Sequence, residues 1–280
     1  MTDTRLLHSN GRVAHVSLKD EIQADSHVEG ELSQIVQPVA SLLDNPNGLR
    51  QRELVFGELF NRLQDEDGYS FGYALRDGYA GYIDSEYLNP VNLPATHVVG
   101  ARMTYACAEP DIKSDSGRLL LSMGARVAVV AEREKWAEID HVKGSLFVPA
   151  SHLRRIDEIE DDPVEVAERL LGTPYVWGGN SALGIDCSGL VQMACLACGI
   201  DCPGDSDLQM AGPGIVLSAD VPLKRGDLLF WKGHVAWVLD ADAIIHANAF
   251  HMAVSHEPTH QAIERIEAYG DGKIIMRKRL

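Results

Sequence analysis

Positive charge is scarce in this sequence of 280 residues: 25 lysines and arginines stand against 41 acidic residues, a formal net charge of −16. A nucleic-acid partner needs a basic face for its phosphate groups, so we expect none. An anionic membrane surface would also repel such a chain. Long apolar runs are missing too, since no stretch approaches the roughly 20 apolar residues that cross a bilayer. We therefore expect no membrane contact either.

A secretory signal is also missing from MTDTRLLHSNGRVAHVSLKD, which has no continuous apolar core and no small-residue cleavage site. Cysteine is sparse, and four of the five cysteines fall within 187–202 instead of being spread as in a disulfide framework. Both absences favour a cytoplasmic protein with free thiols. The sequence says nothing about the oligomeric state.

Two patterns resemble metal sites, and we expect neither to bind a metal. The spacing of Cys195, Cys198 and Cys202 fits zinc ligands, but ACLACGI continues an apolar helix in which cysteine serves as a small hydrophobic residue. The run 256–260, HEPTH, fits the H-E-x-x-H zinc motif. That motif requires a long helix, and the internal proline predicts a loop here. No cofactor is expected.

Turn signals and composition shifts predict four segments. Residues 1–30 are polar and predict a lead-in arm or one short helix. Residues 31–92 and 93–156 each hold short alternating runs separated by glycine-containing turns, which indicate a small β-barrel or sandwich in each range. Two generic β-modules with no role beyond packing stay an alternative. An acidic linker then leads to Asp162-Pro163, a capping residue followed by proline at the first helical position. A new domain, 157–280, begins there.

The run Gly184-Ile185-Asp186-Cys187-Ser188-Gly189-Leu190 predicts the start of a second helix. Asp186 is the expected N-cap, which places Cys187 in the first turn. The helix dipole and the unpaired N–H groups of that turn favour a thiolate, the nucleophilic form of cysteine. A cysteine at a helix start is more often a small buried residue, so this signal alone does not decide for catalysis.

A thiolate nucleophile needs a base and a group that orients the base. His234 opens one predicted strand, and His246 lies within the next, so antiparallel pairing can bring the two side by side. A single histidine on a strand is usually structural. Two histidines on neighbouring strands, downstream of a cysteine at a helix start, favour a cysteine hydrolase with a papain-like layout.

The motifs GTPYVWGG, DCSG, GHV and IHA, in this order from Gly172 to Ala247, resemble the signature of NlpC/P60 endopeptidases. The resemblance implies that Cys187 is the nucleophile, His234 the general base and His246 the residue that orients it. It also implies that Tyr175 lies beside the nucleophile. GELFNRLQDEDGYSFGYALRDGYAGYIDSEYL resembles a bacterial SH3 (SH3b) domain, and 93–156 resembles a more degenerate copy.

The same resemblance implies which residues bind substrate. In the catalytic domain these are Asp186, Ser188, Trp177 and Ser206, with Asp186 the first candidate for a free N-terminal amine. The arginine that usually precedes Ser206 is absent. In the first SH3b domain, an acidic residue and a tyrosine are expected to close the amine end of the cleft. The candidates for them are Glu53, Tyr79 and Tyr82.

The implied fold is α+β: a papain-like NlpC/P60 catalytic domain after two small SH3b-like β-barrels. The implied reaction cleaves the γ-D-glutamyl-diamino acid bond of murein peptides with a free N-terminal L-Ala, as in cell-wall peptide recycling. The diamino acid, diaminopimelate or lysine, stays open. Two alternatives also stay open: a catalytically silent SH3b module that binds wall fragments or proteins, and a papain-like acyltransferase.

Overall fold

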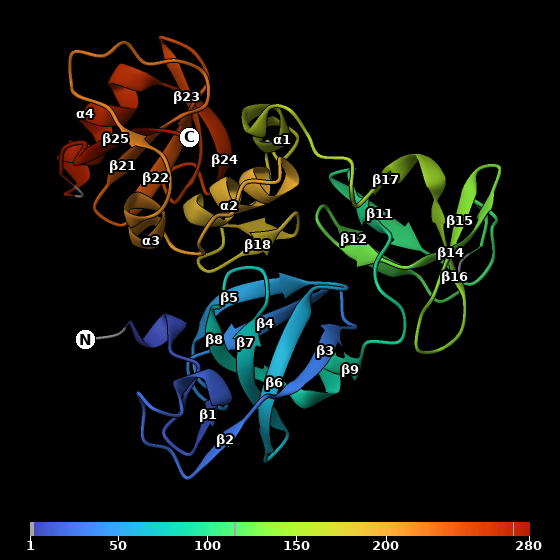
Figure 1. Ribbon diagram of the computed structural model, residues 1–280. Coiled ribbons are helices and arrows are strands. Elements are labelled where there is room, and N and C mark those ends of the chain that lie inside the picture. The colour runs from blue at the N-terminus through green and yellow to red at the C-terminus, as the bar shows by residue number, and fades with distance from the viewer. Residues whose placement is uncertain (1–2, 115, 271) are drawn as a thin grey trace. The chain divides into compact units, whose positions relative to one another are not determined.

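The computed structural model describes residues 3–114, 116–270 and 272–280. The chain divides into two compact units, Met1–Glu158 and Ile159–Leu280. Strands dominate the first unit, and the second combines one large sheet with four α-helices (Figure 1). No helix of the described residues is long and apolar enough to cross a membrane.

The described part of the N-terminal segment, residues 3–30, holds more than the one short helix that the sequence offered as an alternative to a lead-in arm. It forms two short strands, β1 (Val13–His15) and β2 (Ser26–Val28), which pair in parallel. Two 3-10 turns, Thr4–Leu6 and Val16–Leu18, flank β1. The buried Val13 packs with Leu63 and Phe71 of the following module, and this apolar contact fixes the segment.

The first β-module is one sheet with the strand order β5-β4-β8-β7-β6-β3-β9. Its buried core includes Ile35, Leu42, Phe60 and Ile83. Among the described residues no pairing joins β5 to β9, so a closed barrel is not observed. The strands are β3 (Glu31–Ile35), β4 (Val39–Leu43), β5 (Arg50–Val55), β6 (Leu59–Glu66), β7 (Tyr69–Ala74), β8 (Ala80–Asp84) and β9 (Leu88–Pro90).

The second β-module consists of three small sheets, β13-β10-β17, β11-β12 and β14-β15-β16. Its core includes Val55 and Phe56 of the first module, so the two modules share apolar packing within one unit. The strands are β10 (His97–Val99), β11 (Met103–Ala106), β12 (Leu119–Ser122), β13 (Arg126–Val127), β14 (Val129–Arg133), β15 (Trp136–Ile139), β16 (Leu146–Pro149) and β17 (Leu153–Arg155).

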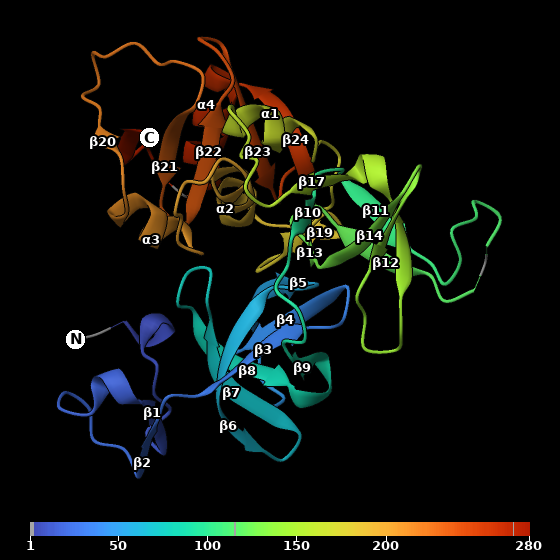
Figure 2. The same ribbon diagram turned by 45° about the vertical axis from the view of Figure 1, so that its right-hand side comes forward.

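The second unit is built on a six-stranded sheet with the order β20-β25-β21-β22-β23-β24 (Figure 2). Helix α2 (Cys187–Ala197) contacts β22 and β23, and α4 (Thr259–Tyr269) packs on the sheet through Ala262 and Ile266. The strands are β20 (Ile215–Val216), β21 (Asp227–Trp231), β22 (His234–Val238), β23 (Ala243–Asn248), β24 (Ala253–Pro258) and β25 (Met276–Arg279).

The remaining elements of this unit lead into α2. Helix α1 (Pro163–Glu168) begins as the sequence predicts: Asp162 accepts a hydrogen bond from the backbone N–H of Val164, and proline follows the cap. A short hairpin of β18 (Asn180–Ser181) and β19 (Gly184–Ile185) comes directly before α2. Helix α3 (Ser206–Ala211) follows α2 and contacts it.

Candidate active site

Cys187 is the first residue of α2, and Asp186 is its N-cap. One oxygen of Asp186 accepts hydrogen bonds from the backbone N–H of Gly189 at 2.6 Å and from Ser188 Oγ at 2.9 Å. The other oxygen accepts from the N–H of Gly178 at 2.9 Å. Charge-assisted bonds of this kind are strong, so this buried carboxylate fixes the start of α2 and with it the backbone of Cys187.

Two further contacts hold the first turn of α2 in place. A Cβ atom at Gly189 would lie 2.4 Å from the carbonyl oxygen of Gly179, so the helix backbone approaches the preceding turn more closely than any side chain permits. The buried Gln209 of α3 donates from Nε2 to the carbonyl oxygens of Ser188 at 2.8 Å and Pro203 at 2.9 Å. Cys187 therefore stands on a rigid support.

The thiol of Cys187 lies beside the strand that carries the first histidine, since its Sγ is 3.9 Å from the carbonyl oxygen of Gly233. His234 begins β22 directly after that glycine. Nε2 of His234 is 2.9 Å from Nδ1 of His246 on β23, and the two rings are 5.1 Å apart at 61°. In the structure, Cys187 thus lies beside the start of β22, and the two histidines that the sequence singled out contact each other.

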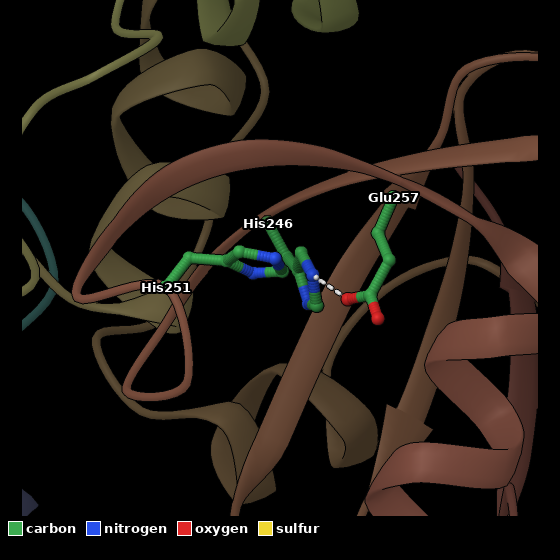
Figure 3. Close-up of side chains that lie close together, drawn as sticks. All are labelled: His246, His251 and Glu257. Carbon is green, nitrogen blue, oxygen red and sulfur yellow. Dashed lines mark hydrogen bonds and ion pairs between the residues drawn. The ribbon is translucent and has the colours of Figure 1, made fainter.

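His246 is fully buried, and its other nitrogen has a partner that the sequence analysis missed. Nε2 of His246 lies 3.0 Å from a carboxylate oxygen of Glu257 (Figure 3). Arg265 on α4 donates to both oxygens of Glu257, at 2.9 and 2.7 Å. A chain of contacts therefore runs from His234 through His246 and Glu257 to Arg265.

Glu257 belongs to the HEPTH run, for which the sequence analysis predicted a loop. That prediction is wrong, because His256 and Glu257 lie in β24, and α4 begins directly after Pro258. The proline causes no break, since it occupies the N-cap position, where no N–H is needed. Glu257 pairs with Ile244 in the sheet, two residues from His246 on β23, which places both side chains on one face.

Electrostatic interactions fix the protonation state of the groups in this chain of contacts. Burial by itself raises the pKa of Glu257, but the hydrogen bonds from Arg265 and His246 outweigh it and lower that pKa to about 2. An ionised carboxylate only accepts, so Nε2 of His246 must donate. Burial lowers the pKa of His246, so this ring is neutral near pH 7 and its Nδ1 accepts from Nε2 of His234.

Nδ1 of His234 is then left with the lone pair that a general base needs. Burial, the neighbouring His246 and Arg265 lower the pKa of His234 to about 3, which keeps its ring neutral at physiological pH. A single ionised glutamate thus sets the tautomers of two successive imidazoles. Chemically, the arrangement provides a cysteine at a helix start, whose thiol lies beside the carbonyl of Gly233, and directly after that glycine a neutral, oriented histidine. These are the parts of nucleophilic catalysis.

His251 completes a cluster with His246 and Glu257 whose possible ligand atoms lie within 4.8 Å of one another (Figure 3). Most of these atoms already have hydrogen-bond partners. Both oxygens of Glu257 accept from Arg265, and Nδ1 of His251 lies 3.0 Å from Oδ1 of Asn248. Hydrogen bonding therefore accounts for the cluster.

Of the other predicted site residues in the second unit, Tyr175 shares a cavity with His234. Tyr175 is partly exposed, and the cavity is open, with a volume of about 450 Å³. Trp177 is 59% exposed. Ser206 is the partly exposed first residue of α3. Ser188 is buried, and its hydroxyl is used to hold Asp186.

The three residues predicted from the first β-module lie in the other unit, where each has local contacts. Glu53, on β5, is 7% exposed and forms an ion pair with Arg50 at 2.9 Å. Tyr79 is part of the apolar core of the module. The ring of Tyr82 is tilted by 48° against that of Phe71, with ring centres 5.1 Å apart. Their role toward substrate stays a prediction.

Comparison with known families agrees with this geometry. Residues 172–266 match the NlpC/P60 family, a range that begins before Cys187 and ends after Arg265. The second unit is an NlpC/P60 domain. Residues 42–88, in the first unit, match the bacterial dipeptidyl-peptidase SH3 domain. The NlpC/P60 domain is therefore preceded by at least one SH3 domain.

Two relatives illustrate the sequence similarity. Dipeptidyl-peptidase 6 of Lysinibacillus sphaericus is 32% identical over 166 residues, which cover 55% of this chain and 61% of that protein. The gamma-D-glutamyl-L-lysine dipeptidyl-peptidase of Bacillus subtilis (strain 168) is 32% identical over 139 residues, 45% of this chain and 46% of that one. The chain thus matches about half the length of these relatives.

Solved structures extend the similarity of fold beyond the NlpC/P60 domain. The crystal structure of an NlpC/P60 family protein from Bacillus cereus ATCC 10987 has a TM-score of 0.75 and 18% identity, and the match covers 89% of this chain and 99% of that one. An NlpC/P60 endopeptidase from Photobacterium damselae subsp. piscicida has a TM-score of 0.62 and 14% identity, with 95% and 76% covered. At these identities the likeness shows the fold alone.

Proposed function

We propose that this protein is a cysteine peptidase whose nucleophile is Cys187 and whose general base is His234. One observation carries the proposal: the ordered contacts from His234 through His246 to an ionised Glu257 leave Nδ1 of His234 as a proton acceptor in the unit that carries Cys187. A module that only binds fragments has no use for a buried, oriented pair of neutral imidazoles.

The proposed reaction is amide hydrolysis through an acyl-enzyme. Nδ1 of His234 takes the thiol proton of Cys187, and the thiolate attacks the carbonyl carbon of the substrate. The C–N bond then breaks as His234 returns that proton to the leaving amine. Water, deprotonated by His234, attacks the thioester, which releases the acid and the thiolate, and the thiolate recovers the proton. His246 and Glu257 keep the His234 ring in place throughout.

The proposed substrate is a murein peptide, L-Ala-γ-D-Glu-diamino acid, with a free N-terminal amine. The names of two relatives support the γ-D-glutamyl bond. The carboxylate of Asp186, next to the nucleophile, supplies negative charge for the ammonium of the alanine. We further propose that residues 93–156 are a second SH3-like module and that the protein acts in the cytoplasm, where imported wall fragments are recycled.

Hydrolysis of synthetic L-Ala-γ-D-Glu-diaminopimelate, followed by mass spectrometry, tests the proposal. The expected products are L-Ala-γ-D-Glu and free diaminopimelate. Cys187→Ala should release neither, whereas Cys195→Ala, a change at a buried cysteine of the same helix, should remain active. Absence of cleavage by the wild-type protein would favour a silent binding module. Transfer of the dipeptide to an added amine, with no free acid formed, would favour an acyltransferase.

The free amine has its own test. Acetylation of the alanine removes the positive charge that would pair with the buried Asp186, and the loss of one partner of such a charge pair typically costs several kcal/mol. We expect the free peptide to be cleaved at least about a hundredfold faster than the acetylated one, because each 1.4 kcal/mol is a factor of ten. Equal rates would contradict the recycling role and leave the cysteine mechanism intact.

A further inference from the structure

The cavity beside His234 has a distinctive charge. Among the residues that the structure describes, its charged lining residues are Lys232 and Arg265, and no aspartate or glutamate lines it. The chain as a whole carries a formal net charge of −16, so a cavity with only cationic charges goes against the general composition. Such a site attracts a ligand that carries a carboxylate.

The fold fixes the backbone of Lys232 and the side chain of Arg265. Lys232 and Gly233 form the two-residue turn between β21 and β22, in which Trp231 pairs with His234. The lysine backbone is therefore fixed two residues from the proposed base. The turn requires a left-handed residue, and Gly233 supplies it with φ +72°.

Arg265 is fixed more tightly. Its side chain is 15% exposed, it donates to both oxygens of Glu257, and its guanidinium lies 4.6 Å from the centre of the Phe250 ring. Phe250 also lines the cavity, as does Tyr269, whose ring centre is 5.9 Å from that of Phe250. The cavity is thus a cationic recess with an aromatic rim.

The chemistry of the proposed reaction decides which half of the substrate enters this recess. The acyl half stays bonded to Cys187, which is not a lining residue. The amine half receives its proton from His234, and His234 lines the cavity. The leaving group must reach that imidazole, so the cavity is on the side of the diamino acid.

We propose that this cavity binds the leaving diamino acid and selects diaminopimelate over L-lysine, an inference that rests on the proposed peptidase function. The free end of a lysine side chain carries one positive charge, which Lys232 repels, whereas the charge of Arg265 is compensated by Glu257. The corresponding end of diaminopimelate carries an ammonium and a carboxylate, so its net charge is zero. The carboxylate at this end can pair with Lys232, and a lysine side chain has no such group, although both residues carry the same α-carboxylate.

Three peptides of the form L-Ala-γ-D-Glu-X test this selection, with X as diaminopimelate, L-lysine, or diaminopimelate amidated at its side-chain carboxyl group. The amide keeps the size of diaminopimelate but removes the negative charge. We expect kcat/KM for the diaminopimelate peptide to exceed both others about fivefold or more, as for a partly screened charge pair. The preference should shrink as salt rises.

Variants of the lysine separate its charge from its bulk. Lys232→Gln should bring the three rates together, and Lys232→Glu should make the lysine peptide the better substrate. Lys273→Glu makes the same change of net charge at an 80% exposed side chain that does not line the cavity, and should keep the wild-type order. Equal rates for all three peptides with the wild-type protein, or an unchanged order in Lys232→Glu, would overturn the selection.

A binding measurement keeps the two proposals apart. Calorimetry with the Cys187→Ala protein should give tighter binding of the diaminopimelate peptide than of the lysine peptide. If the wild-type protein cleaves none of the peptides, the peptidase function fails, and the selection of a leaving group fails with it. If it cleaves all of them and Cys187→Ala binds them equally, only the selection fails.

Discussion

The carboxylate of Glu257 lies 3.0 Å from Nε2 of His246 and, with a pKa lowered to about 2, leaves that nitrogen no role other than donor. Glu257 resembles the aspartate of a serine-protease triad, which fixes the tautomer of an imidazole by accepting its hydrogen bond. Here a second imidazole, that of His246, lies between the carboxylate and the proposed base. The acidic residue does not contact the proposed base. It fixes the base through a second, fully buried ring, so its loss should act on catalysis more than on binding.

Glu257→Gln tests this role. The glutamine amide can donate to His246, which would reverse the tautomers of both histidines and remove the lone pair from Nδ1 of His234. We expect kcat to fall about a hundredfold or more, with KM changed little, because the loss of a correct tautomer in a triad costs up to about ten-thousandfold. Steady-state kinetics with the diaminopimelate peptide would measure both constants.

The matched control is Glu264→Gln, a change of the same chemistry at an exposed position on α4. It should keep the wild-type kcat. A Glu257→Gln enzyme with unchanged kcat, or with a defect confined to KM, would contradict the role of Glu257 in orienting His234 through His246. Circular dichroism should show that both variants are folded.

Arg265→Met should change the pH dependence of activity. Without the arginine hydrogen bonds, burial dominates and the pKa of Glu257 rises from about 2. The carboxylate is then protonated in a pH range where the wild-type group is ionised, so kcat should decline toward acid pH earlier than in the wild-type protein. A pH–rate profile between pH 4 and 8, in mixed buffers, would show the shift. Parallel acid limbs in both proteins would refute it.

His234 should make folding stability depend on pH. Its pKa is lowered to about 3 in the folded protein from an ordinary value of 6.5, so the unfolded chain binds more protons between these values. Stability from this residue is full above pH 6.5 and declines as pH falls toward 3. At pH 5 the loss should reach at most about 2 kcal/mol, and His234→Gln should remove it.

Urea unfolding at pH 7 and pH 5 can follow this effect through tryptophan fluorescence, because Trp177, Trp231 and Trp237 belong to the second unit. His260→Gln, at an exposed position on α4, is the control and should keep the wild-type difference between the two pH values. The same difference in His234→Gln would show that this histidine does not contribute.

Gly189→Ala should damage both stability and activity. The added Cβ would lie 2.4 Å from the carbonyl oxygen of Gly179, and neither backbone can give way without moving the start of α2. We expect a loss of about 1–3 kcal/mol, as for overpacking, together with a lower kcat. Gly100→Ala is the control, because its Cβ would meet nothing nearer than 3.8 Å. Wild-type activity in Gly189→Ala would show that α2 can shift freely.

Local sequence signals were sufficient for the frame of the active site. Asp186 before a helical apolar pattern placed Cys187 in the first turn of α2, and alternating apolar runs placed His234 and His246 on β22 and β23. These features depend on a few neighbouring residues, so they can be predicted without the tertiary structure. The family resemblance added the pairing of the cysteine with these histidines.

Glu257 could not be found in the same way. Its function depends on the register between β23 and β24, which sets it diagonally opposite His246, and on Arg265 two helical turns into α4. A proline next to an acidic residue reads locally as a loop, and only the sheet pairing changes that interpretation. The one local signal was the strand-like run AFHMAVS, residues 249–255, which comes directly before His256 and Glu257.

The closed barrels expected for the β-modules depend on long-range pairing as well. The observed sheet of the first module ends at β5 and β9, which the alternation of residues within each strand cannot predict. The same applies to Tyr79: a tyrosine between two turns is compatible with a cleft or a core, and the structure places its ring in the core.

Cys187 and the contacts that link His234 to Arg265 come from separate stretches of the NlpC/P60 domain: α2 ends at Ala197, and the linked residues lie in β22 to α4. Between them, residues 218–220 are exposed and belong to no helix or strand. A gene cut at this point would give one fragment with a thiol and another with a base, each inert alone. Fused to two interacting proteins, the fragments would turn peptide hydrolysis into a reporter of their proximity.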